Sequence, residues 1–124
     1  MYEYRATVTR VVDADSIRAS VDLGFSTWLH NVDIRLDGLD APELPTEAGR
    51  SAKAALMLLL LNEGVGRQII LRTRKDVTEK FGRMLGTLIL PALTVDGVTE
   101  LNVNANDWLI AHGFARPYFG GKRE

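Results

Sequence analysis

The sequence contains no cysteine, which excludes disulfide bonds and thiolate metal sites. Its four prolines are isolated, and no linker, repeat or low-complexity stretch divides the chain. The longest apolar run, 54–61, is far too short to cross a bilayer, which needs about 20 residues. The first residues lack the basic stretch and apolar core of a signal peptide. We therefore expect no membrane partner and, by default, a cytoplasmic protein, with secretion left open if a signal was trimmed.

The chain also lacks a strong charge of one sign. Its net charge is −1 and its pI about 6.1, which argues against a protein that coats nucleic acid non-specifically. A length of 124 residues suits one domain with a real core. We expect that domain to span 1–119, followed by a flexible tail over 120–124. The oligomeric state stays open, with a monomer as the default.

Alternating apolar and polar residues predict three β-strands in the first third of the chain, over 4–12, 17–23 and 32–36. Val11 and Val12 break the alternation of the first strand, as a β-bulge would. A turn is expected over 13–15, and Gly24 ends the second strand. The three strands are therefore expected to form a meander.

The apolar period becomes helical between 49 and 62, where five residues share one stripe. They are Ala52, Ala55, Leu56, Leu59 and Leu60. Two further strands are predicted over 67–75 and 83–90, and a second helix from Asn104 to His112, closed by Gly113. This order predicts a mainly β fold with some α: a five-stranded Greek-key barrel of the OB type with about two helices.

The segment 35–43 carries the strongest chemical signal. Arg35 lies on the polar face of a strand, and Asp40 and Glu43 follow on a loop stiffened by Pro42. Neighbouring carboxylates repel one another unless a hard cation or an arginine offsets them. A planar guanidinium also grips phosphate with two hydrogen bonds. This combination indicates phosphoryl chemistry, although the same residues also suit a plain surface turn.

Four segments, in order along the chain, together resemble the staphylococcal (micrococcal) nuclease family. They are 11–17 (VVDADSI), 35–43 (RLDGLDAPE), 80–83 (KFGR), and 101–104 with 108–109 and 113–115. The similarity runs from about Val8 to Tyr118. It implies an OB-fold enzyme that cuts DNA or RNA with Ca²⁺ and little sequence preference.

The resemblance also assigns roles to individual residues. It implies that Ca²⁺ is held by the carboxylates of Asp15 and Asp40 and by the main-chain carbonyl of Ala41. The catalytic residues that it implies are Arg35 and Arg83, which grip the phosphate, and Glu43, which positions or deprotonates the attacking water. Substrate contacts are expected at Lys80, Phe81 and Tyr118. Hard oxygen ligands suit Ca²⁺ independently of any family.

Two other hypotheses use the same residues. The barrel could be a catalytically weak or inactive nucleic-acid-binding or interaction module. It could also be a structural calcium module, which would leave the two arginines without a role. Two departures from the family pattern bear on substrate affinity and on turn geometry: Phe81 lacks a phenol hydroxyl, and Ala14 replaces a glycine.

Several residues are expected to be structural. His30 and His112 lack partners at metal-ligand spacing, so a zinc site is not predicted. We expect Trp28 and Trp108 to be packing residues rather than stacking platforms. Leu58 and Leu61 lie partly off the helical stripe; burial beneath the second helix is favoured over contact with a partner subunit. The basic residues Arg72, Arg74 and Lys75 suit a solvated sheet edge better than a nucleic-acid contact.

Overall fold

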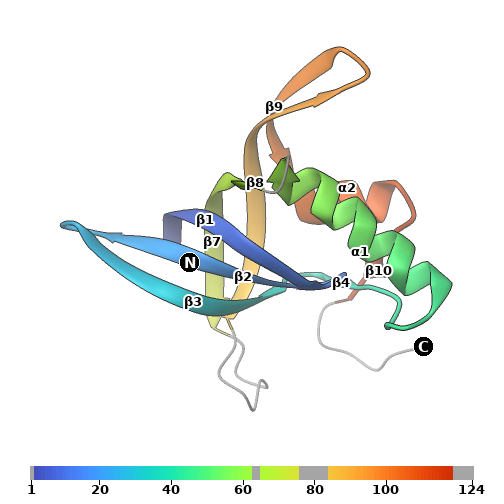
Figure 1. Cartoon of the computed structure of the whole chain (residues 1–124), viewed down its shortest axis with the longest axis horizontal. Helices are drawn as coiled ribbons and strands as arrows, with labels where there is room; N and C mark the ends of the chain where they lie inside the picture. Colours follow the sequence, from blue (N-terminus) through green and yellow to red (C-terminus); the bar gives the residue numbers. More distant parts are fainter. Residues whose placement is uncertain (1, 63–64, 76–83, 119–124) are drawn as a thin grey trace.

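The computed structural model describes residues 2–62, 65–75 and 84–118. Figure 1 shows a twisted sheet with two helices gathered toward one end. The elements are β1 (Tyr2–Asp13), β2 (Ser16–Gly24), β3 (Thr27–Leu36), β4 (Leu39–Asp40), α1 (Glu47–Leu60), β5 (Leu61–Asn62), β6 (Val65–Gly66), β7 (Gln68–Lys75), β8 (Met84–Val95), β9 (Val98–Asn104), α2 (Ala105–Ala111) and β10 (Arg116–Pro117). None of the described helices is long and apolar enough to span a bilayer.

The main sheet closes on itself. Its strand order is β3-β2-β1-β7-β8-β9, and β8 also pairs with β3 in parallel, Ile34 opposite Met84 and Leu36 opposite Gly86. All other pairings in this sheet are antiparallel. The result is a mainly β fold with two helices and a ring-like sheet, with β9 attached outside the ring. The predicted meander of the first three strands is confirmed.

The core lies between the inner face of the ring and the apolar stripe of α1. Val8, Ile17, Ile34 and Leu88 are fully buried within it. All five residues of the predicted helical stripe are buried, which confirms that prediction. Helix α1 packs against β1 and α2, and the two helices lie together at one end of the ring-like sheet (Figure 1).

The largest differences between the predicted and observed boundaries concern α1, β3 and β8. Helix α1 spans 47–60 rather than 49–62, and β3 begins at Thr27 rather than at 32. Strand β8 continues to Val95 and turns into β9, which the sequence analysis missed. Asp96 and Gly97 form the connecting turn with φ of 50° and 78°. An Asp-Gly pair with two positive φ values is a strong hairpin signal, so this strand was predictable.

The predictions for two large apolar side chains were wrong. Leu58 is 82% exposed because it lies on the face of α1 opposite the buried stripe. Trp28 is 43% exposed on β3. Trp108 packs against the core as expected, and its ring stacks on that of His112 at 3.9 Å.

Candidate cation and phosphate site

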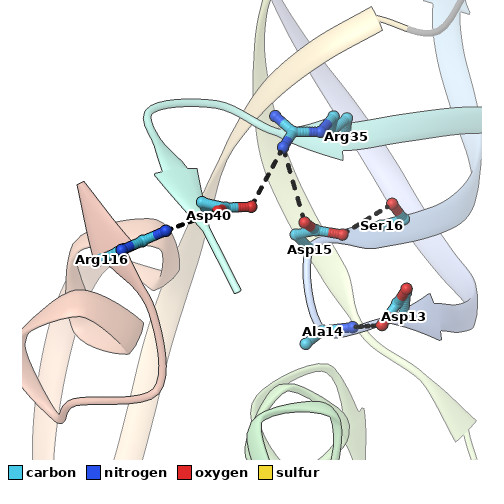
Figure 2. Close-up of polar contacts among 7 residues, drawn as sticks. All are labelled: Asp13, Ala14, Asp15, Ser16, Arg35, Asp40 and Arg116. Carbon is cyan, nitrogen blue, oxygen red and sulfur yellow. Dashed lines mark hydrogen bonds and ion pairs between the residues drawn. The ribbon is translucent and has the colours of Figure 1, made fainter. Parts of the chain in front are cut away.

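The β1–β2 turn holds the first acidic residues of the site. Asp13 accepts a hydrogen bond from the main-chain N–H of Ala14 at 2.7 Å, which fixes the turn (Figure 2). The main-chain carbonyl of Asp15 accepts a 2.8 Å hydrogen bond from the N–H of Leu36. This bond ties the turn to the end of β3, and Asp15 therefore lies beside Arg35.

Arg35 brings the two predicted carboxylate ligands together. Its Nη2 lies 3.7 Å from Oδ2 of Asp15 and 3.9 Å from Oδ1 of Asp40 (Figure 2). Asp40 is 6% exposed, and the side chains of Asp15 and Arg35 are each 17% exposed. Two partly desolvated carboxylates thus share one guanidinium, and a cation between them would relieve their mutual repulsion.

Burial raises the pKa of the Asp15 carboxyl above its ordinary value of 3.8. The positive charge of Arg35 and a 3.2 Å hydrogen bond from Ser16 act in the opposite direction, and the charge of Asp13 adds to the increase. Because burial is the largest cause, the ionised form of Asp15 is less stable in the metal-free folded protein than in water. Such a carboxylate gains more from a divalent cation than a solvated one does.

Arg116 is a site residue that sequence analysis missed. Its Nη2 lies 3.7 Å from Oδ2 of Asp40, on the side of that carboxylate opposite Arg35 (Figure 2). The contact exists because β10 pairs with β4 and places Arg116 directly opposite Asp40. A two-residue strand pair between segments so distant in sequence leaves no signal in composition or periodicity.

The β3–β4 turn, which leads to Asp40, is held by a buried asparagine. Asn106, 3% exposed, donates through Nδ2 to the carbonyls of Asp37 and Gly86 and accepts the N–H of Leu88. Arg74 donates two hydrogen bonds to the Asp37 carboxylate, at 2.6 and 2.9 Å. Arg74 thus holds the β3–β4 turn instead of being a free cation at a sheet edge.

A polar hollow of about 300 Å³ opens beside Asp15 and Arg35. Its lining residues are Asp13, Asp15, Ser16, Arg35, Ala41, Pro42, Glu43 and Leu44. Glu43 is exposed, in contrast to the buried Asp40. The hollow is therefore bordered by Asp15 from one segment and by Ala41 and Glu43 from another. Asp40 does not line it and joins the site through its contact with Arg35.

The remaining predicted residues fall into two groups. The ring of Tyr118 lies 5.8 Å from Cζ of Arg35, a cation–π distance, and its N–H donates to the carbonyl of Gly38. Tyr118 is thus brought to the site. The other three, Lys80, Phe81 and Arg83, lie outside the described residues.

The donor set has a definite chemical character. Within 2–62, 65–75 and 84–118, no three His, Cys, Asp or Glu side chains form a metal-binding group. The predicted set instead holds two carboxylates, of Asp15 and Asp40, and the main-chain oxygen of Ala41. All are hard oxygen donors, which suit Ca²⁺, and the remaining ligands would have to be water or phosphate oxygens.

No known protein-family model matches the sequence, and no curated protein is significantly similar to it. The function is therefore inferred from the residues and their geometry.

Gly49 is a further residue on which the site depends. A Cβ at this position in α1 would lie 2.3 Å from the carbonyl oxygen of Glu43 and 3.0 Å from that of Pro42. The loop carrying Glu43 crosses the first helical turn here, held by Thr46, whose N–H and Oγ1 both donate to the Glu43 carbonyl. Only glycine leaves room for this crossing, which explains an otherwise unfavourable residue in a helix.

We expect Gly49→Ala to displace the Glu43 loop. For the nuclease that the sequence resemblance implies, this should lower phosphodiester cleavage roughly tenfold, an order of magnitude for a small misplacement of a catalytic group. Steady-state cleavage of a labelled oligonucleotide measures this effect. In a Glu43→Gln background the same change should have little further effect, because both act on one group. Equal, additive losses in the two backgrounds would contradict the proposed link.

Proposed function

We propose that the protein is a calcium-dependent nuclease with an OB-type barrel, hydrolysing phosphodiester bonds of DNA or RNA. The observation that carries the proposal is that the carboxylates of Asp15 and Asp40 meet at Arg35, beside a hollow that Asp15, Arg35 and Glu43 line. The ring order, in which β3 pairs with both β2 and β8, agrees with the OB type.

Each residue has a role that its position supports. Asp15, Asp40 and the carbonyl of Ala41 would hold the cation, which neutralises charge on the phosphoryl oxygens. The guanidinium of Arg35 faces the same space and would donate hydrogen bonds to the phosphate as negative charge develops. Arg83 is proposed to act in the same way from the segment that precedes β8.

Glu43 is proposed to position or deprotonate the attacking water. It is exposed at the rim of the hollow, where a water molecule can reach it, and it sits in a Pro-stiffened loop. A general base contributes about 10²–10⁴-fold in such reactions. Tyr118, stacked near Arg35, is proposed to contact the substrate together with Lys80 and Phe81.

The test is cleavage of single-stranded DNA with and without Ca²⁺. We expect cleavage at about 1–10 mM Ca²⁺, a concentration for weak sites, and none after chelation with EGTA. Glu43→Gln should reduce the rate by roughly 10²-fold or more. Glu47→Gln is the matched control, since Glu47 is also exposed, at the start of α1, but does not border the hollow.

Loss of cleavage in both glutamine variants would contradict the role of Glu43. A wild-type protein that binds single-stranded DNA but does not cleave it with Ca²⁺ would instead support the binding-module hypothesis. Calcium binding without any nucleic-acid binding would support the structural calcium module.

A further inference from the structure

Strand β3 has one open edge. It pairs with β2 along its length, but β8 reaches its other side only at Ile34–Leu36. In the described part of the chain, no strand pairs with that side between Thr27 and Asp33. Residues 27–31 are all exposed. Among the described residues, the main-chain N–H and C=O groups of this edge have no strand partner, so they are a template for another strand.

The open edge is apolar and uncharged. Leu23, Trp28 and Leu29 are 46%, 43% and 53% exposed, and Phe25 at the tip of the hairpin is fully exposed. From 23 to 32 there is no Asp, Glu, Lys or Arg. Charged residues, proline and β-bulges usually protect a free edge. This edge has no charge and no proline, and its register against β2 shifts at His30–Asn31.

The tip of the hairpin is also conformationally unfavourable. Phe25 and Ser26 have φ of 53° and 59°, the left-handed region that Asn and Gly adopt readily and Phe does not. Folding of one chain gives no reason for an exposed aromatic ring in such a turn, because no core contact is made there. A contact outside the chain would account for it.

We propose that this edge pairs antiparallel with the same edge of a second copy, about a two-fold axis near Leu29. The pairing satisfies the open main-chain groups and buries Leu29 and Trp28 of both chains. It brings no like charges together, since the segment is uncharged. The ladder is short because Asn31, with φ of 57°, interrupts it, so the dimer should dissociate on dilution.

The alternatives are less favourable on physical grounds. Strand β9 also ends the sheet, but a two-fold pairing there would bring Glu100 of each copy close together. Insertion of the β3 edge into lipid would leave its main-chain groups without partners in hydrocarbon. The proposed contact lies at the end of β2 and β3 remote from β4 (Figure 1). None of its residues lines the hollow beside Asp15 and Arg35.

Three Leu→Lys variants test the proposal by sedimentation velocity. We expect the wild-type mass to rise from 13.7 kDa toward twice that value between about 1 and 200 µM, a range that covers weak dimers. Leu29→Lys should stay monomeric throughout. Leu58→Lys and Leu101→Lys, at leucines that are 82% and 72% exposed on α1 and β9, should behave as wild type.

Phe25→Asn separates dimer formation from folding. Asn suits the turn better than Phe, so this variant should fold at least as stably while its dimer dissociation constant rises tenfold or more. A wild-type protein that is monomeric at the highest concentration would overturn the proposal. So would an oligomer abolished by Leu101→Lys but not by Leu29→Lys. The outcome is independent of nuclease activity, which Leu29→Lys should leave unchanged.

Discussion

Replacing Arg35 by lysine is expected to lower the rate of phosphodiester cleavage by roughly 10²–10³-fold, the usual effect of losing one donor to a developing oxyanion. Lysine keeps the positive charge but presents a single ammonium group instead of a planar fork. It cannot lie within reach of Asp15 and Asp40 and still donate two parallel hydrogen bonds to a phosphate. The loss should appear mainly in kcat, measured at saturating substrate and Ca²⁺.

The matched control is Arg18→Lys. Arg18 lies in the same sheet and forms a 2.9 Å ion pair with Asp33, with both side chains solvated. Neither side chain of this pair lines the hollow, so cleavage by the variant should equal that of wild type. Chemical denaturation of both variants checks the fold. Wild-type kcat in Arg35→Lys, with the protein folded, would contradict the role of Arg35 in catalysis.

Replacing Asp15 by asparagine is expected to stabilise the calcium-free protein at neutral pH by about 1–2 kcal/mol, the order expected for removing a partly desolvated charge. Burial holds the pKa of Asp15 above its unfolded value of 3.8. The folded state therefore binds this proton more tightly than the unfolded chain does. The contribution to stability is greatest below pH 3.8 and is lost as the pH rises through the folded pKa.

At neutral pH the wild type thus carries the full unfavourable contribution of the ionised Asp15, and the asparagine variant does not. Urea denaturation at pH 7 with EGTA measures the difference. Asp33→Asn is the control, because the Asp33 side chain is 52% exposed and should change stability little. A destabilised Asp15→Asn protein would mean that the ion pair with Arg35 outweighs burial.

The sequence predicted most of the architecture because its signals are local. Alternating residues in 17–23 and the stripe of α1 mark elements whose one face must be buried, so periodicity alone locates them. The hairpin β8–β9 was missed, although the Asp96–Gly97 pair is a sequence typical of a hairpin turn. The start of β3 at Thr27 could not be predicted from the sequence. Phe25 and Ser26 form the preceding turn with two positive φ values, and neither residue type is expected there.

The candidate site was predictable only in part. Asp15, Arg35, Asp40 and Glu43 lie in short motifs whose residue types suit one chemistry. The fold brings three of them to one hollow and Asp40 to the Arg35 guanidinium. Arg116 joins Asp40 through strand pairing across distant segments, which no local pattern encodes. Likewise, the need for glycine at 49 depends on a loop crossing a helix, which is a property of the folded chain.

Calorimetric titration of Ca²⁺ into the wild type and Asp15→Asn, with and without a nucleoside 3′,5′-bisphosphate, tests most directly whether these residues form a cation and phosphate site. We predict that the wild type binds one Ca²⁺ in the weak range, about 0.1–1 mM, and more tightly when the nucleotide is present. Asp15→Asn should bind neither ligand measurably under the same conditions. Calcium binding of equal strength in both proteins, or nucleotide binding that is indifferent to Ca²⁺, would contradict the account.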